Sequence, residues 1–475
     1  MRILLQFVPE QDRVARIRLE YAFRLFCAIY DHQPLVEDQR DGSSDIALTY
    51  GPSCGVPEHI RLTKASPRRP SHETAPNPIP YQSEEQTTVL FYPPESGREP
   101  DWLAEIFEWV SCADEYACRE RDSVGRVPFE RSYIGRHGLD PHEPYAAIAM
   151  ACLQRAIVRV KPQLPIRPPS PFVSAQHVVV NTHDIDLLAL NRIRSSYRVA
   201  KNAFISLAVY RRPRVAAQQS KAAVKVALGA PDPLDQVKFL TEQEHQRDAT
   251  ASYYFLCRRG HRRDGNYSLR QASPLMGSLQ NAGAEVGVHA SYRSMEQPDG
   301  LAAEFDQMHG LGFHPIGTRQ HWLRFTVAQL VRNVESAGAL YDASLGWPDQ
   351  SGFRAGACFA FPPYDFQREA PANFLEMPLA VMDRAGLDIG DSDGADPITR
   401  TLTASRRYGW GGISVVWHPT AFGGGQYPLE VGERFFQLLD DAPNHDEAWV
   451  SGASFVRDVW PRYESAGLLP ARGWK

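Results

Sequence analysis

The stretch HVVVNTHDID, residues 177–186, shows the pattern that decides the fold class. An apolar run at residues 177–180 leads directly into polar residues and ends on two carboxylates, Asp184 and Asp186. The same order, an apolar strand followed by a charged or imidazole side chain, recurs three times further along the chain. The later segments are EVGV before His289, residues 315–318 before Arg319 and His321, and ISVVW before His418.

Helices are predicted between these strands. Residues 301–309, 326–336 and 429–439 have helical character, and the last two segments carry apolar residues at i, i+3 and i+4 spacing. Strands that alternate with helices indicate a parallel sheet. Because α/β barrels and open α/β sheets keep their chemistry at the carboxyl ends of the strands, we expect the polar side chains to gather there.

A proline-rich segment, KPQLPIRPPSPF at residues 161–172, is predicted to divide the chain. Proline cannot continue a helix and favours extended backbone, so this run suits a semi-rigid linker. Residues 1–160 are predicted to form a smaller, mixed α/β accessory domain, and residues 173–475 form the second domain. The accessory domain is expected to contain helices at 13–30, 102–110 and 145–160, strands at 45–50 and 87–92, and a loop at 65–80.

Composition excludes several classes of protein. Of the 475 residues, 43% are hydrophobic and 23% are charged, which argues against a wholly disordered or fibrous chain. The formal net charge of −5 gives no global basic field for nucleic acid or an anionic membrane, although a local patch stays open. Seven cysteines without CxxC pairs argue against a disulfide framework. With no signal-peptide pattern and no membrane-spanning run, the chain is predicted to be cytoplasmic.

Asp184 and Asp186 form the first candidate site. Two carboxylates two residues apart point to the same side of a continuing strand, and like charges at that distance disfavour joint ionisation unless a cation lies between them. A metal site is one interpretation. The other is a carboxylate that caps the following helix, and both remain open at this point.

Histidines provide the other candidate ligands. A lone histidine after a strand, such as His289, is more often a buried or surface imidazole than a ligand. One carboxylate with two imidazoles is nevertheless a common open ligand set for Zn²⁺ or a related ion, and the second imidazole could come from His321 or His183. His418 is a candidate general acid because imidazole titrates near neutrality, and its alternative is a rim histidine that transfers no proton.

Seven strings in a fixed order give the sequence a family resemblance. They are NTHDID, EVGVHASY, GTRQHWLRF, YDASLGW, GFRAG, EMPLAVMD and VVWHPTAF. In this order, from Val178 to about Leu439, they resemble the polysaccharide deacetylase family (NodB-homology, carbohydrate esterase), in its branch with a THDxD first motif. Residues 107–139 more weakly resemble the accessory domain of that branch.

The resemblance implies a fold and an activity. The fold would be a distorted, partly open (β/α)7 barrel, and the reaction would be metal-assisted removal of an acetyl group from an N-acetylated sugar. Zn²⁺ is the expected ion, with Co²⁺, Ni²⁺ or Mn²⁺ as alternatives. Residue by residue, the resemblance makes Asp184 the general base, Arg319 its support, Asp186 and His289 metal ligands, and His418 the general acid.

One position departs from the family pattern. The second motif of the family, HxxxH, has its second histidine four residues after the first, where this chain has Arg293. The i, i+4 geometry that lets two imidazoles meet one ion is therefore missing. We expect His321 to supply the second nitrogen, because the side chain of His183 should point away from that of Asp184 on a strand.

Further residues are candidates for substrate contact. Trp322 and Trp417 adjoin the motifs and could stack on a sugar ring, although plain packing is the alternative. Arg354 lies between glycines in GFRAG, where it could approach a polar ligand, and a structural turn is the alternative.

The sequence therefore predicts a metal-dependent hydrolase of carbon–nitrogen bonds that acts on an N-acetylated glycan or sugar intermediate. A catalytically degenerate, carbohydrate-binding scaffold is one alternative, because Arg293 replaces a ligand. Another metal-dependent C–N hydrolase on the same barrel, acting on a small amide, is the second alternative.

Overall fold

The computed structural model describes residues 1–7, 12–36, 44–50, 59–65, 67, 76–83, 87–189, 191–384 and 396–473. The loop predicted at residues 65–80 lies partly outside these ranges, and its last two residues begin strand β5.

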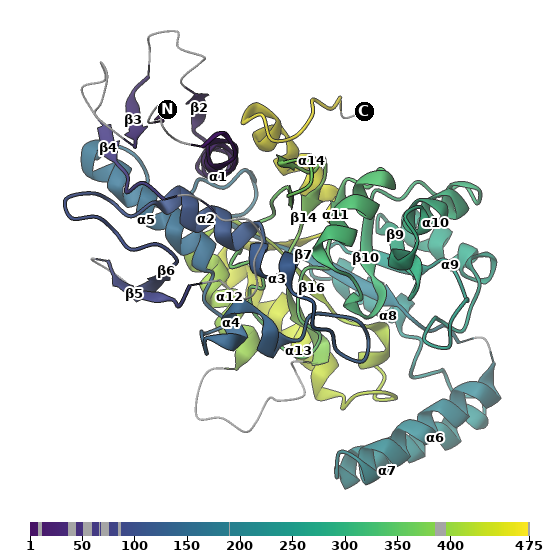
Figure 1. The fold of residues 1–475 in the computed structure, drawn as a ribbon. Helices are drawn as coiled ribbons and strands as arrows, with labels where there is room; N and C mark the ends of the chain where they lie inside the picture. The colour runs from purple at the N-terminus through teal and green to yellow at the C-terminus, as the bar shows by residue number, and fades with distance from the viewer. Residues whose placement is uncertain are drawn as a thin grey trace.

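A nine-stranded parallel sheet forms the larger part of the molecule (Figure 1). Eight strands follow the order β14-β11-β10-β9-β8-β7-β16-β15, and β17 pairs with the first half of β7. The strands are β7 (His177–Ile185), β8 (Ser252–Leu256), β9 (Glu285–Ala290), β10 (Gly317–Gln320), β11 (Tyr341–Asp342), β14 (Leu375–Glu376), β15 (Leu379–Met382), β16 (Gly411–Val416) and β17 (Glu447–Val450).

The sheet curves into a distorted barrel because its two end strands are consecutive in sequence. Only Met377 and Pro378 separate β14 from β15. The Met377 backbone N–H donates to the Asp342 carbonyl on one side, and the Ser414 N–H donates to the Pro378 carbonyl on the other, each at 2.8 Å. The predicted α/β barrel is therefore confirmed, with eight strands along the path instead of about seven.

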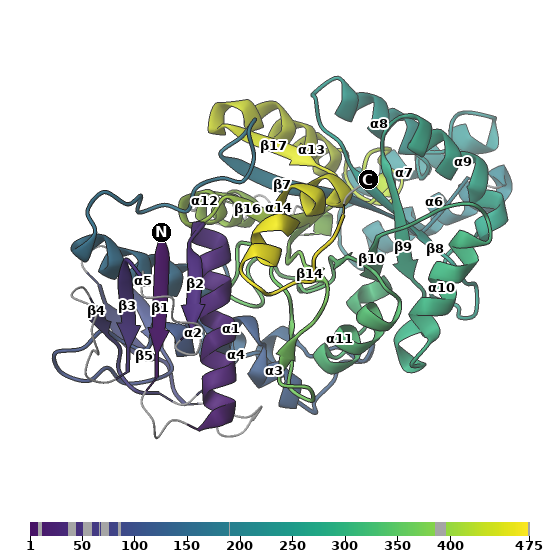
Figure 2. The ribbon, with the colours of Figure 1, turned by 90° about the horizontal axis from the view of Figure 1, so that it is seen from above.

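Helices surround this barrel (Figure 2). They are α6 (Arg192–Ala208), α7 (Pro213–Ala227), α8 (Val237–His245), α9 (Leu269–Asn281), α10 (Gly300–His309), α11 (Val327–Ser336), α12 (Pro397–Tyr408), α13 (Glu430–Asp441) and α14 (Gly452–Ser465). Helices α10, α11 and α13 begin and end within two residues of the predicted segments. A capping box between Thr326 and Gln329 starts α11, since each side chain satisfies a backbone N–H of the first turn.

The N-terminal part is a second, smaller α/β unit, seen beside the barrel in Figure 2. Its parallel sheet has the order β2-β1-β3-β4, and β5 and β6 form an antiparallel hairpin. The strands are β1 (Arg2–Gln6), β2 (Gln33–Val36), β3 (Ile46–Thr49), β4 (His59–Arg61), β5 (Ile79–Gln82) and β6 (Thr87–Leu90). The helices are α1 (Arg13–Tyr30), α2 (Trp102–Val110), α3 (Ala113–Ala117), α4 (Tyr133–Arg136) and α5 (Tyr145–Val160). Helices α1, α2 and α5 match their predicted bounds, whereas β1, β2 and β4 were not predicted.

The N-terminal unit packs directly on the barrel. One continuous cluster of buried apolar side chains runs through both parts. Trp410 donates from Nε1 to the Ile29 carbonyl at 3.2 Å, and the Tyr21 hydroxyl donates to the Pro362 carbonyl at 2.7 Å. The division at residues 161–172 stays a prediction. Among the described residues, no helix is both long and apolar enough to cross a membrane.

Candidate metal centre

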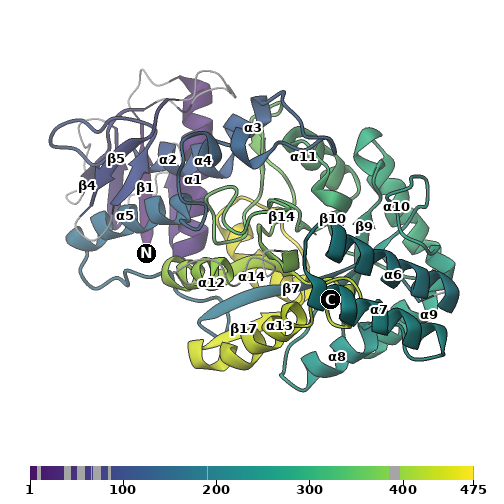
Figure 3. The same ribbon diagram turned by 90° about the horizontal axis from the view of Figure 1, so that it is seen from below.

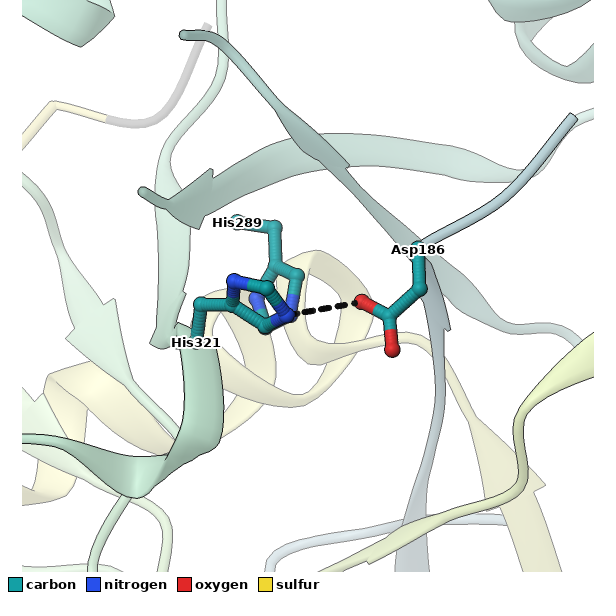
Figure 4. Close-up of side chains that lie close together, drawn as sticks. All are labelled: Asp186, His289 and His321. Atoms are coloured by element: carbon teal, nitrogen blue, oxygen red, sulfur yellow. Dashed lines mark ion pairs between the residues drawn. The ribbon is translucent and has the colours of Figure 1, made fainter. Parts of the chain in front are cut away.

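Three side chains from the ends of strands β7, β9 and β10 converge at the mouth of the barrel. Asp186 directly follows β7, His289 lies near the end of β9, and His321 follows β10. The Oδ1 atom of Asp186 lies 3.4 Å from Nε2 of each histidine (Figure 4). One ligand atom from each residue lies within 4.8 Å of the other two, so the group could hold a metal ion. The expected grouping of Asp186, His289 and His321 is therefore present.

The orientation of these groups suits a cation. Nδ1 of His289 lies 3.0 Å from the Arg319 carbonyl, and donation to that oxygen directs Nε2 toward Asp186. Oδ1 of Asp186 is buried and has no hydrogen-bond partner among the described residues. A buried polar atom without a partner is costly, and a bound cation would satisfy it. Two imidazole nitrogens and one carboxylate oxygen therefore fit a divalent transition metal.

The protonation states of the two imidazoles differ. Burial lowers the pKa of His321 to about 4, which leaves it in the neutral form that binds metals. His289 is also buried, but Asp184 and Asp186 outweigh the burial and raise its pKa. A cation bound here therefore competes with a proton on Nε2 of His289.

The backbone turns sharply at the end of β10. Trp322 and Leu323 have φ values of 63° and 49°, in the left-handed region that non-glycine residues rarely adopt. Such conformations concentrate at functional sites, and here the turn immediately follows His321.

Arg293, which stands where the family has its second histidine, and His183, the other candidate ligand, both lie away from the cluster. The side chain of Arg293 is 65% exposed and faces Glu296, with 3.8 Å between Nε and the carboxylate. His183 is fully buried on the opposite side of β7, where Nε2 lies 2.7 Å from Glu244 and Nδ1 lies 2.6 Å from the Trp417 carbonyl. This placement follows from the alternation of side chains along a strand.

Asp184 is held by a fully buried arginine. Nη1 of Arg319 donates to Oδ1 of Asp184 at 3.2 Å and to the Thr182 hydroxyl at 2.6 Å. Nε of Arg319 donates to the Ala343 carbonyl at 2.7 Å, and Nη2 donates to the Ser414 hydroxyl at 3.2 Å. The guanidinium is thus fixed by three elements besides its carboxylate partner.

Asp184 is ionised in this setting. Burial alone would raise the pKa of Asp184, but the positive charges of His289, Arg319 and His418 hold it below its usual value. Asp186 likewise has a lowered pKa despite its burial, chiefly because His321 and His289 face it. Both carboxylates are therefore acceptors at neutral pH.

His418 is paired with an acid that sequence analysis did not assign. Oδ2 of the fully buried Asp383 accepts from both Nδ1 and the backbone N–H of His418, each at 2.9 Å. Burial would lower the pKa of His418, but Asp383, with help from Asp186 and Asp184, raises it to about 10. His418 is therefore protonated at neutral pH, with Nε2 3.9 Å from Oδ2 of Asp184. In the sequence, Asp383 could have been recognised as a candidate because it directly follows the apolar run of EMPLAVMD.

The three residues predicted to contact substrate have different surroundings. Trp322 is 42% exposed, and its ring centroid lies 6.1 Å from that of His321. Trp417 is fully buried, and its Nε1 donates to the Val431 carbonyl at 2.9 Å. Trp417 precedes His418, so strand alternation turns it into the core and away from the site. The expectation that Trp417 stacks on a sugar is therefore corrected.

The expectation that Arg354 contacts substrate is also corrected. Its Nε donates to Glu115 at 3.0 Å, and Nη2 donates to the same carboxylate at 2.5 Å. Its Nη1 donates to the Gly346 carbonyl at 2.7 Å. The buried Arg354 therefore joins the barrel to Glu115 on α3 of the N-terminal unit, and each of its three nitrogens donates to a protein partner.

Comparisons with known proteins add a distant similarity. No family model matches the chain, and no curated protein matches it. Among solved structures, the peptidoglycan deacetylase PdaC from Bacillus subtilis aligns with a TM-score of 0.28 and 11% identity, over 62% of this chain and 96% of that chain. A mutant of that enzyme aligns with a TM-score of 0.30 and 10% identity, over 63% of this chain and 97% of that chain.

Proposed function

We propose that the barrel is a metal-dependent hydrolase that removes the acetyl group from the nitrogen of an N-acetylated sugar. The observation that carries the proposal is the convergence of Asp186, His289 and His321 within 4.8 Å, with Asp184 and His418 beside them. The ordered motif strings assign four of these positions, Asp184, Asp186, His289 and His418, to the chemistry of polysaccharide deacetylases, and we propose that His321 replaces the missing histidine of the second motif.

The residues can carry out the two proton transfers that amide hydrolysis needs. A divalent ion held by Asp186, His289 and His321 would lower the pKa of bound water and polarise the acetamide carbonyl. Asp184, whose Oδ1 is held by Arg319, accepts the water proton on Oδ2. His418, kept protonated by Asp383, donates from Nε2 to the nitrogen. The C–N bond breaks, a C–O bond forms, and acetate and a free amine are released.

Zn²⁺ is the ion that we propose. Two imidazoles and one carboxylate form an open set that suits zinc and leaves room for water, and Co²⁺, Ni²⁺ or Mn²⁺ are the alternatives. The substrate that we propose is a glycan or a sugar intermediate of its assembly, and a cytoplasmic location remains a prediction.

The scaffold alternative depended on the loss of a ligand at Arg293. Because His321 lies 3.4 Å from Asp186, a three-residue set is present without the second motif histidine. We therefore favour the enzyme over the scaffold.

Acetate release from metal-loaded protein tests the proposal. The panel contains N-acetylhexosamines, their oligosaccharides, nucleotide-activated N-acetylhexosamines and simple acetamides, and Asp184→Asn is the control that lacks the base. We expect acetate from at least one sugar and none from the variant. Release from the simple acetamides alone would favour a small-amide hydrolase, and no release from any compound would contradict the proposal.

A further inference from the structure

Helices α6 and α7 form a hairpin that projects from the barrel in Figure 1 and lies in front of it in Figure 3, which is seen from below. We call residues 191–230 the basic hairpin. The two helices pack chiefly on each other: Val199 and Ala223 form a small buried cluster with Leu234, which follows the hairpin, and the Ser206 hydroxyl donates to Gln219 at 2.7 Å. The sequence analysis did not single out this element.

One face of α6 exposes large apolar side chains. Ile193, Tyr197, Phe204 and Leu207 are 80%, 73%, 69% and 54% exposed. They follow one another at intervals of four, seven and three residues, which places them on a single helical face. The same hairpin also exposes Val209, Tyr210, Val224 and Leu228. Monomeric proteins rarely leave a continuous apolar surface of this kind open to water, and such surfaces mark interaction sites.

The charge of the basic hairpin is of one sign. Residues 191–230 contain no aspartate or glutamate, whereas the chain as a whole has a net charge of −5, so the remainder is strongly acidic. On α6, Arg194, Arg198 and Lys201 lie four and three residues apart on a face beside the apolar one, and they also line the cavity between the hairpin and the barrel. The cations of the hairpin are Arg192, Arg194, Arg198, Lys201, Arg211, Arg212, Arg214, Lys221 and Lys225.

The basic hairpin lies next to the mouth of the barrel. The side chains of Asn202 and Gln219 donate to the carbonyls of Gly425 and Gln426, at 2.9 and 3.1 Å, in the loop that follows His418. A cavity of about 880 Å³ lies between the hairpin and the barrel, and Leu187, the neighbour of Asp186, lines one part of it. A surface bound by the hairpin would therefore adjoin the candidate site.

We propose that the basic hairpin docks the protein on an anionic lipid bilayer. A helix of this kind inserts its apolar face among the acyl chains of a bilayer. Its adjoining cations then lie at the lipid phosphates. Two hairpins of the same charge repel each other, which disfavours a second copy as the partner, and a nucleic acid leaves the exposed apolar face in water. The docking does not depend on the proposed deacetylase activity.

Vesicle sedimentation of the full-length protein tests the proposal. The probes are vesicles of phosphatidylcholine alone and vesicles of phosphatidylcholine and phosphatidylglycerol in equal parts. We expect binding to the anionic vesicles alone, and at least a tenfold weaker partition for the triple variant Ile193→Ser/Phe204→Ser/Leu207→Ser. Val173→Ser is the matched control, because Val173 is fully exposed outside the hairpin and its replacement should leave binding unchanged.

Circular dichroism establishes that the triple variant is folded, as expected for exposed positions. Absence of wild-type protein from the anionic vesicle pellet would overturn the proposal, as would equal binding by the triple variant. A wild-type dimer that the triple variant converts to a monomer, or a hairpin-dependent shift of labelled RNA without vesicle binding, would also overturn it. An inactive protein that still binds vesicles would refute the proposed function and leave the docking intact.

Discussion

Two buried arginines of this protein face carboxylates in different ways. Arg354 and Glu115 form a bidentate pair between the barrel and the N-terminal unit, and the third arginine nitrogen is bound to a carbonyl. At the barrel mouth, Arg319 makes one contact of 3.2 Å to Asp184, and the nearby Oδ1 of Asp186 has no hydrogen-bond partner among the described residues. The first pair is complete in itself, whereas the second set leaves a carboxylate oxygen that a bound cation would satisfy.

The difference separates stability from chemistry. Replacing one member of the complete pair leaves a buried charge unpaired, so the cost falls on folding. If the proposed reaction takes place, replacing a member of the incomplete set removes a reacting group, so the cost falls on the rate. Substitutions at individual residues should therefore affect either the stability of the fold or the rate of the reaction.

The largest effect is expected for Asp184→Asn. An amide cannot accept the water proton, so kcat for acetate release should fall by about a thousandfold. Metal content, measured on the same sample, should stay near the wild-type value, and circular dichroism should show a folded protein. A variant that keeps kcat within tenfold of wild type would show that Asp184 is not the base.

Arg354→Met should lower the stability of the fold and leave the reaction rate of the folded protein largely unchanged. It leaves Glu115 buried and unpaired, which costs about 3–5 kcal/mol of unfolding free energy in denaturant titration. The double variant Glu115→Gln/Arg354→Met should recover part of that loss, since no charge is then left buried. A large fall in kcat of the folded single variant would instead place Arg354 in the chemistry.

Asp383→Asn should have an intermediate effect on the rate. Its carboxylate raises the pKa of His418 to about 10, so its loss lowers that pKa and moves the alkaline limb of the kcat profile to lower pH. At neutral pH we expect kcat to fall by about 10- to 100-fold, as for other residues that orient a functional histidine. An unchanged pH profile would contradict the positioning role of Asp383.

The smallest effect is expected for Trp322→Ala. Aromatic stacking contributes about 0.5–1.5 kcal/mol, so KM should rise by roughly two- to twelvefold with little change in kcat. Trp417→Phe is the matched control, because the buried Trp417 should affect stability and leave KM unchanged. Equal changes of KM in both variants would remove the distinction between them.

The sequence was sufficient for much of this arrangement. The apolar periodicity of α1 predicted its bounds because this helix buries one face, and the apolar segments of α2 and α5 were also predicted as helices. The convergence of Asp186, His289 and His321 could be expected because the ends of neighbouring parallel strands share one edge.

Other features depend on pairings that the linear pattern does not contain. Asp383 and His418 are 35 residues apart and meet because β15 pairs with β16. Glu115, the partner of Arg354, lies 239 residues away in the N-terminal unit. The basic hairpin carries large apolar residues that stay exposed. Apolar periodicity predicts buried faces, so it does not distinguish this element.

The central claim is that His321 supplies the metal ligand that the second motif lacks. In this chain Arg293 stands where the family has its second histidine. Metal content after equilibrium dialysis against Zn²⁺, measured on wild type, His321→Ala and Arg293→Ala, tests it most directly. We predict one bound ion in the wild type and in Arg293→Ala, and loss of stoichiometric binding in His321→Ala with the fold retained by circular dichroism. Full metal content in His321→Ala, or its loss in Arg293→Ala, would contradict the claim.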